Sequence, residues 1–295
     1  MADDRLRGVL EALLVSFLWS SSYVLTKIGL RDTSPLLLVA LRYLVASLVL
    51  VPVALARGAH RGLDRGTLAE LALLGLAGYA VAQGLQCVGL YLLPAVTVTF
   101  ILNFTPVIVL LINVAAFRRS PSPRQVLGSL VVLAGAYVFL GGDVWLGSPT
   151  GVLVTLASGA GWAVYLVAVG RLFARKPVEP LALSAFAMAS GTVVIAGSAA
   201  ALEGFAPITA QSAAIILWLG VVNTAAAFFL WNHALARVDA FEVSMIQNTM
   251  LIQIAVLSWL FLGETLTAAK AAGMALVLAG VLMVQTAPLR GGGRN

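Results

Sequence analysis

The amino-acid sequence predicts an all-α integral membrane protein with ten transmembrane helices arranged as two inverted five-helix repeats. Three observations lead to this prediction: the composition, the spacing of long apolar runs, and a similarity between the two halves. Of the 295 residues, 61% are hydrophobic and 10% are charged, against about 45–50% and about 25% in soluble domains. Such a chain has too few polar side chains to cover a water-facing surface, which excludes a soluble enzyme, a disordered chain and a coiled coil.

Ten apolar runs are long enough to cross a bilayer, which takes about 20 helical residues. In chain order they cover roughly residues 8–30, 34–56, 68–93, 94–117, 124–141, 150–171, 180–203, 212–236, 239–262 and 267–287. The first run is too long for the core of a signal peptide, so we expect it to remain as a helix. Pro35, Pro94, Pro123 and Pro180 stand at the starts of runs, where a missing backbone N–H costs nothing. The runs do not alternate polar and apolar residues, as strands of a membrane barrel would.

The basic residues are unevenly divided between the loops on the two sides of the predicted bundle. Three of the eighteen, Lys27, Arg31 and Lys270, fall on the side away from the termini, and Arg42 lies inside the second run. The other fourteen fall on the side that holds both termini: Arg5, Arg7, Arg57, Arg61, Arg65, Arg118, Arg119, Arg124, Arg171, Arg175, Lys176, Arg237, Arg290 and Arg294. Because cytoplasmic loops carry an excess of Lys and Arg, this division predicts that both termini lie in the cytoplasm.

The two halves of the chain resemble each other at an offset of 145 residues. The segment Val-Leu-Ala-Gly at 132–135 recurs at 277–280, and other matched pairs are Gly75 with Gly220, Ala95 with Ala240, Asn103 with Asn248, and Gly128 with Gly273. We therefore expect a first five-span repeat over residues 1–145 and a second over 146–295. Because five is odd, the second repeat must insert upside down. Inverted repeats are typical of secondary transporters, whose substrate site lies near the midplane between the repeats.

Polar and aromatic residues deep inside the runs are the candidate site residues, because burying them in lipid is costly. Tyr79, Gln83 and Gln86 share one helical face by their i, i+4, i+7 spacing. Thr99 and Asn103 do so in the next run, and Ser244 and Asn248 are their repeat equivalents. The complete substrate-binding set is Trp19, Tyr23, Tyr79, Gln83, Gln86, Thr99, Asn103, Trp162, Tyr165, Ser244, Gln247 and Asn248, with Pro106 and Arg42 as candidate gating residues.

Each candidate also has a purely structural interpretation. Asn and Gln side chains hold membrane helices together by hydrogen bonds, the tryptophans can serve in packing, and Pro106 can kink its helix without any part in gating. Arg42 is about seven residues into its run, so its side chain can snorkel to the nearer surface. These alternatives stay open at the level of sequence.

Several kinds of activity lack the residues that they need. No P-loop is present, Cys87 is the only cysteine, and His60 and His233 are the only histidines, on different segments. We therefore expect no enzyme activity, no cofactor and no metal. No carboxylate lies at the predicted midplane, which favours facilitated or weakly coupled transport over proton antiport. A channel would more naturally show a filter loop or a charged ring.

The chain resembles the drug/metabolite transporter superfamily, EamA type. The resemblance is carried by Leu18-Trp19-Ser20-Ser21-Ser22-Tyr23, Leu41-Arg42-Tyr43, Pro106, Trp162, Ala234-Leu235, Leu262-Gly263-Glu264, Gly273 and Leu278-Ala279-Gly280. Two positions depart from the family pattern. The Gly-Glu expected after the fourth span is Arg118-Arg119, and the proline expected in the ninth is Leu251.

Within that superfamily the chain is most similar to the YddG-like amino-acid exporters. The resemblance implies a multi-pass protein of the inner (plasma) membrane that exports amino acids or similar small metabolites by alternating access. The implied partners are a small-molecule substrate and the lipid bilayer, without nucleic acid, and a monomer is compatible with this picture. The alternatives are a carrier of cationic drugs or other metabolites, and the permease subunit of an ATP-driven complex.

Overall fold

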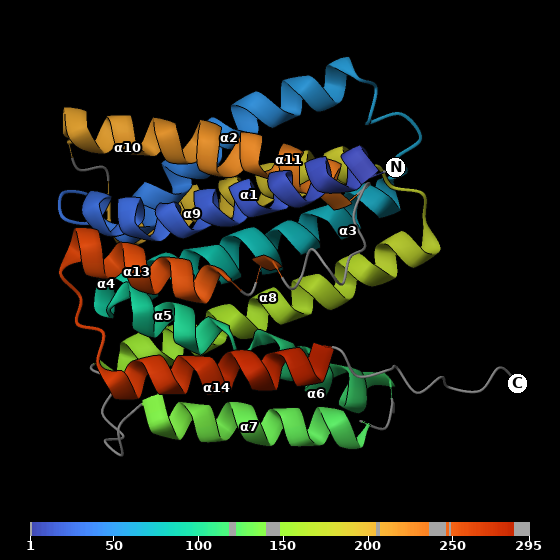
Figure 1. The fold of residues 1–295 in the computed structure, drawn as a ribbon. Coiled ribbons are helices and arrows are strands. Elements are labelled where there is room, and N and C mark those ends of the chain that lie inside the picture. Colours follow the sequence, from blue (N-terminus) through green and yellow to red (C-terminus); the bar gives the residue numbers. More distant parts are fainter. Residues whose placement is uncertain are drawn as a thin grey trace, which may run out of the picture.

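A computed structural model describes residues 2–117, 122–139, 148–204, 207–235, 246–247 and 249–285. Within these ranges every regular element is a helix, and Figure 1 shows the helices lying side by side in one bundle. The first half contains α1 (Ala2–Gly29), α2 (Pro35–Ala56), α3 (Arg65–Gly75), η1 (Leu76–Gln83), α4 (Gly84–Leu92), α5 (Ala95–Leu102), α6 (Thr105–Phe117) and α7 (Pro123–Phe139). The second half contains α8 (Pro149–Arg175), α9 (Pro180–Leu202), α10 (Ala210–Gly220), η2 (Val221–Ala226), α11 (Ala227–Leu235), α13 (Met250–Leu262) and α14 (Ala268–Gln285).

The helix boundaries follow the apolar runs closely, with one interruption. Among the described residues, seven helical stretches are long and apolar enough to cross a membrane, and three shorter apolar helices accompany them at Pro123–Phe139, Met250–Leu262 and Ala268–Val284. The predicted run 94–117 is divided into α5 and α6 by a break at Asn103 and Phe104. Pro106 is the second residue of α6, and its missing N–H removes the hydrogen bond that would continue α5 into α6. Residues 239–245 of the predicted ninth run lie outside the described residues.

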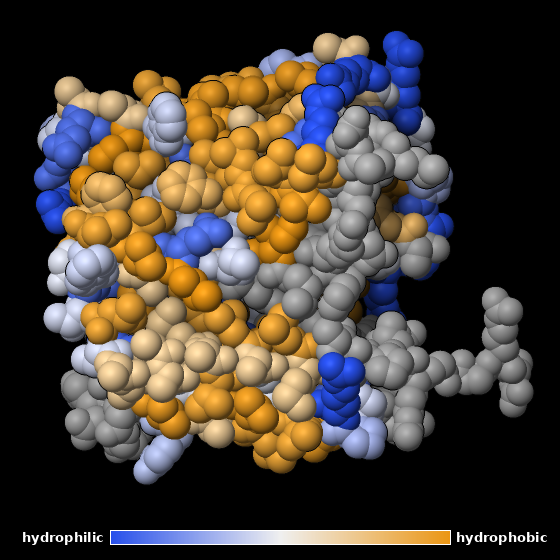
Figure 2. Space-filling model, in the orientation of Figure 1, coloured by the Kyte–Doolittle hydropathy of each residue, from blue (hydrophilic) through white to orange (hydrophobic). Residues whose placement is uncertain are grey.

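The bundle has two ends and an apolar surface between them. In Figure 1, α1 begins and α14 ends at the same end, on the right, which we call the terminal end; Gly29 and Pro35 lie at the other, the distal end. Figure 2 shows hydrophobic residues over much of the visible face between the two ends. Leu48 and Val193 are 66% and 73% exposed. An apolar surface of this extent is explained by contact with lipid.

Helices α2 and α9 pack together and bring the two halves into contact. The hydroxyl oxygens of Ser47 and Thr192 lie 3.3 Å apart, and the two residues are separated by 145 positions, the offset of the sequence repeat. This contact therefore joins residues that correspond to each other under the sequence offset.

Helices α7 and α14 form a second pair, seen side by side at the bottom of Figure 1. Glycines allow this approach, because a Cβ atom built on Gly280 would lie 2.6 Å from the carbonyl oxygen of Gly128, and one on Gly273 would lie 2.5 Å from Cα of Phe139. Small residues at helix contacts permit dense packing in lipid, where no hydrophobic effect drives association.

Candidate substrate site

Two π-helical segments interrupt long helices at equivalent places in the two halves. Segment η1 begins directly after Gly75 and η2 directly after Gly220, a pair matched by the 145-residue offset. Tyr79 in η1 and Asn223 and Thr224 in η2 are fully buried. Because π-helical turns are rare and occur frequently at functional sites, these segments are natural places to look for a site. Neither Asn223 nor Thr224 is among the site residues predicted from the sequence.

A pocket opens between α1, α2 and α4 in the distal half of the bundle. In this conformation it is small, with room for about one water molecule, and it is partly open to solvent. Its lining combines one guanidinium with neutral polar groups and apolar side chains: Ser22, Tyr23 and Thr26 from α1, Leu38, Val39 and Arg42 from α2, Gln83 from η1, and Gln86, Cys87 and Leu90 from α4. None of these lining residues is a carboxylate. The pocket is therefore chemically suited to an anionic group with an apolar portion.

Arg42 extends into the bundle rather than towards the distal surface. Its Nε–H donates to Oγ1 of Thr224 in η2, with 2.9 Å between the two atoms, and its Cζ atom lies 5.6 Å from the centroid of the Tyr43 ring. Thr224 is well inside its own helical stretch, so the snorkelling conformation considered from the sequence is not the one observed.

Segment η2 also contacts α1. The amide nitrogen of Asn223 donates hydrogen bonds to the carbonyl oxygen of Leu18 and to Oγ of Ser21, the latter at 3.1 Å. Side chains of two consecutive η2 residues thus reach α1 and α2, the helices that line the pocket.

Four of the predicted site residues belong to a continuous row of aromatic rings through the middle of the bundle. The centroids of Trp19 and Phe228 lie 5.5 Å apart, those of Phe228 and Tyr79 6.3 Å, and those of Tyr79 and Tyr165 5.7 Å. Trp162 stacks on Tyr165 at 4.8 Å. We call these five residues the aromatic row. It joins α1, α11, η1 and α8, and Trp19 and Trp162 stand at its two ends.

Tyr43 and Trp231 extend the aromatic row sideways. Tyr43 lies 5.6 Å from Tyr79, and Trp231 lies 4.9 Å from Trp19. The site residues predicted from the sequence do not include Tyr43, Phe228 or Trp231. Two features of the sequence could have pointed to these residues. Tyr43 directly follows Arg42, and Phe228 and Trp231 lie in the same apolar run.

Three other predicted residues, Thr99, Asn103 and Gln247, are not among those that line the pocket. The hydroxyl of Thr99 donates to the carbonyl oxygen of Ala95 at 2.8 Å, and the side-chain amide of Asn103 donates to the carbonyl oxygen of Thr99 at 2.9 Å, so both bond within α5 and its end. Gln247 is partly exposed near the start of α13. Ser244 and Asn248 lie outside the described residues, as does the side chain of Pro106. The structure therefore gathers Tyr23, Arg42, Gln83 and Gln86 in the pocket and Trp19, Tyr79, Trp162 and Tyr165 in the aromatic row.

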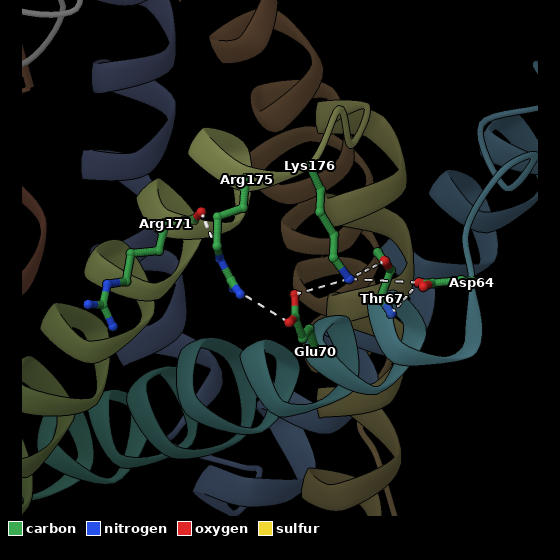
Figure 3. A network of polar contacts seen from close by, with 6 residues as sticks. All are labelled: Asp64, Thr67, Glu70, Arg171, Arg175 and Lys176. Carbon is green, nitrogen blue, oxygen red and sulfur yellow. Dashed lines mark hydrogen bonds and ion pairs between the residues drawn. The ribbon is translucent and has the colours of Figure 1, made fainter.

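At the terminal end an ionic cluster joins α3 to α8 (Figure 3). Nζ of Lys176 donates to Oγ1 of Thr67 at 2.8 Å and lies 3.8 Å from carboxylate oxygens of Asp64 and Glu70. Arg175 lies 3.5 Å from Glu70. Hydrogen bonds from the side chain and the backbone N–H of Thr67 hold the pKa of the Asp64 carboxyl below its ordinary value. Exposed ion pairs contribute little individually, so the cluster matters mainly as a connection between the two halves.

At the distal end, two carboxylates of the second half cap helices of the first. Glu203 accepts hydrogen bonds from the N–H groups of Leu36 and Leu37 at 3.0–3.1 Å. Glu264 accepts them from Ala95 at 2.7 Å and Val96 at 3.1 Å. A negative charge is favourable there, because the N-terminus of a helix carries partial positive charge and unpaired N–H groups.

The Glu264 cap bears on one departure from the family pattern. Glu264 follows Gly263, whose positive φ of 69° ends α13 in the left-handed conformation that glycine adopts easily. The residue 145 positions earlier is Arg119, where the resemblance led us to expect a glutamate. The sequence therefore keeps this acidic residue in only one of its two repeats.

A bundle of apolar helices with a polar pocket inside it defines a multi-pass membrane protein built around an internal site. The chain belongs to the EamA-like transporter family, whose model matches residues 6–141 and again residues 149–286. It is a membrane transporter, and its multi-pass fold agrees with that family. This membership confirms the family resemblance stated from the sequence.

Individual relatives are distant but span nearly the whole chain. A probable terminal-alkyne amino-acid exporter of Streptantibioticus cattleyicolor is 27% identical, covering 94% of this chain and 93% of the relative. An S-adenosylmethionine/S-adenosylhomocysteine transporter of Chlamydia trachomatis is 26% identical over 85% of this chain and 81% of its own. A protein of known crystal structure is 22% identical in sequence to this chain. The two structures superpose with a TM-score of 0.66 over 94% of this chain and 96% of the other, which shows that they share a fold.

Proposed function

We propose that the protein exports amino acids or similar small metabolites across the inner membrane by alternating access. The observation that carries this proposal is the pocket that contains the Arg42 guanidinium and no carboxylate. A guanidinium binds a carboxylate by charge-assisted, often bidentate hydrogen bonds. The ring of Tyr23 offers a π face to an ammonium group, and Leu38 and Leu90 offer apolar contact to a side chain.

The names of two relatives support this substrate class. One is a probable exporter of an amino acid, and another transports S-adenosylmethionine, a molecule that itself carries an α-amino-acid group. A carboxylate beside an ammonium group is common to both, and it is the part of a substrate that the pocket is suited to bind.

The proposed mechanism needs two gates, which a duplicated and inverted architecture supplies. We propose ten spans in two inverted repeats, residues 1–145 and 146–295. The contact between Ser47 and Thr192, the equivalent starts of η1 and η2, and the shared end of α1 and α14 support this arrangement. The acidic residues of the chain all lie near the ends of the apolar runs, so we propose that transport is facilitated or weakly coupled to protons.

Counterflow in proteoliposomes of the purified protein tests the proposal. Vesicles loaded with unlabelled amino acid should accumulate labelled amino acid transiently, because a carrier is trans-stimulated. Replacing Arg42 by glutamine should raise the KM for amino acids about tenfold or more, since hydrogen bonds to charged groups are worth about 1.5–3 kcal/mol. The matched control is Arg65→Gln, an exposed arginine at the terminal end, which should transport normally.

Three outcomes would contradict the proposal. Flux without trans-stimulation would indicate a channel, and an inactive purified chain would indicate a permease subunit that needs its ATPase. Transport of cationic dyes without transport of any amino acid would favour the drug carrier.

A further inference from the structure

We propose that Thr224 is a positioning residue for Arg42, and that it thereby determines selectivity for substrates that carry a carboxylate. The inference rests on the proposed function and assigns a role to a residue of the second half, remote in sequence from the pocket. Thr224 is 182 positions from Arg42 and does not line the pocket itself.

The hydroxyl of Thr224 is oriented by its own helix. It donates its one hydrogen to the carbonyl oxygen of Leu219 at 2.8 Å, five residues earlier. A hydroxyl has one hydrogen and two lone pairs, so this bond leaves Oγ1 as an acceptor. Oγ1 accepts the Nε–H of Arg42 at 2.9 Å. The side chain is fully buried, which keeps water from replacing either bond.

The π-helical segment places Thr224 where this contact can form. In an α-helix a threonine hydroxyl bonds the carbonyl three or four residues earlier, whereas the wider turn of η2 sets Thr224 against the carbonyl of Leu219. Gly220, directly before η2, allows the segment to lie against α2, because a Cβ atom there would come within 2.6 Å of Cβ of Val45 and 2.9 Å of the carbonyl oxygen of Arg42. The backbone of Arg42 lies against Gly220, directly before η2, and its side chain meets η2 at Thr224.

Fixing Nε decides what the rest of the guanidinium can do. Arg42 lines the pocket. Among the residues that the structure describes, none accepts a hydrogen bond from its two terminal nitrogens. The planar fork therefore has four N–H groups left for a ligand. A guanidinium held at one edge loses less conformational freedom when it binds a carboxylate. Recognition of the carboxylate should thus depend on Thr224, whereas recognition of the other parts of the substrate should not.

The pair is also one-sided. The residues equivalent to Arg42 and Thr224 under the 145-residue offset are Ala187 and Tyr79. The other half therefore folds without a pair of this kind, so the fold by itself does not require the Arg42–Thr224 pair.

The test compares substrates with and without a carboxylate. In counterflow assays, Thr224→Val should raise the KM for a transported amino acid about tenfold. The inhibition constant of the corresponding amino-acid amide should stay within about twofold of wild type, and kcat should change little. Thr224→Ser keeps the hydroxyl and should restore most of the selectivity. The control is Thr155→Val, which removes a fully buried hydroxyl that bonds within α8 at 2.7 Å and should leave the selectivity unchanged.

The outcomes separate this inference from the proposed function. Suppose that the wild type transports amino acids, and that Thr224→Val raises the KM for the amino acid and the inhibition constant of the amide by the same factor, or changes neither. The positioning role is then wrong, while the proposed function stands. If the wild type transports no amino acid, both are wrong. On an Arg42→Gln background, Thr224→Val should have no further effect on selectivity, and an additive effect would also overturn the inference. Thr224→Ala gives the same comparison should the valine variant fail to fold.

Discussion

Polar residues inside the bundle fall into two groups that the sequence alone could not separate. In one group, Oγ of Ser20 donates to Oε1 of Gln253 at 3.0 Å, and the amide nitrogen of Gln253 donates to Oγ of Ser16 at 3.2 Å and to Oγ1 of Thr249 at 2.9 Å. These bonds hold α1 against α13 in the way expected of membrane helices. In the other group, Arg42, Gln83 and Gln86 line the pocket.

The tryptophans at the ends of the aromatic row carry the first prediction. Trp19→Ala and Trp162→Ala should each raise the KM of transport or abolish it without loss of folded protein. The reason is that each variant removes a ring that packs against its neighbour in the row and that belongs to the substrate-binding set predicted from the sequence. Counterflow kinetics and size-exclusion profiles measure the two effects.

The control for these variants is Trp259→Ala, because Trp259 is 57% exposed on α13. It should transport nearly normally. If Trp19→Ala and Trp162→Ala also have wild-type kinetics, the aromatic row serves packing only.

At the scale of elements, helix ends and close helix contacts connect the two halves. The carboxylates of Glu203 and Glu264 cap α2 and α5 at the distal end, and the Lys176 cluster joins α3 to α8 at the terminal end. Between the ends, glycines allow α7 and α14 to pack closely. Each of these contacts pairs residues of different halves.

The Glu264 cap leads to the second prediction. Glu264→Gln should lower the free energy of unfolding by about 1.5–3 kcal/mol, because the amide keeps one acceptor oxygen: one of the two charge-assisted hydrogen bonds to backbone N–H groups becomes a neutral one and the other is lost. Thermal or denaturant unfolding in detergent measures this change. Glu179→Gln is the control, since Glu179 is exposed and its side chain makes no cap bond to α9. Equal stability of the two variants would show that the Glu264 bonds contribute nothing.

The contact between α7 and α14 leads to the third prediction. Gly280→Ala should destabilise the protein by about 1–3 kcal/mol, because a Cβ atom would press on the backbone of Gly128 and Val132, which cannot move aside as a flexible side chain can. Gly197→Ala is the matched control on α9, where nothing lies within 4 Å of the added atom. It should be as stable as wild type or slightly more stable, since alanine favours helix. A wild-type melting temperature for Gly280→Ala would rule out the close contact.

For the whole molecule, the arrangement of the ends leads to a topology prediction. The structure places the start of α1 and the end of α14 at one end of the bundle, and fourteen basic residues lie in the sequence segments assigned to that side. Both termini should therefore be cytoplasmic. A green fluorescent protein fused after Asn295 should fluoresce, and an alkaline phosphatase fused there should be inactive. An active phosphatase fusion would eliminate the ten-span model.

The site could be predicted from the sequence only in part. Tyr23, Arg42, Gln83 and Gln86 were selected because a polar residue in a long apolar run stands out, and all four line one pocket. Thr224 was not selected, since threonine is common in membrane helices and nothing in its run marks a π-helical turn. The residues predicted as one substrate-binding set fall, within the part of the chain that the structure describes, into a pocket and a separate aromatic row.

The sequence by itself determined the class of protein, the places where most helices begin and end, and the offset of the repeat. These properties depend on local composition and on the thickness of a bilayer, so they can be read along one chain. Only the tertiary structure decided which helices meet and which faces they present. The hydrogen bond between Arg42 and Thr224 and the cap of Ala95 by Glu264 join residues 182 and 169 positions apart. Such contacts depend on the rotation and crossing of helices, which the packing of all their neighbours determines together.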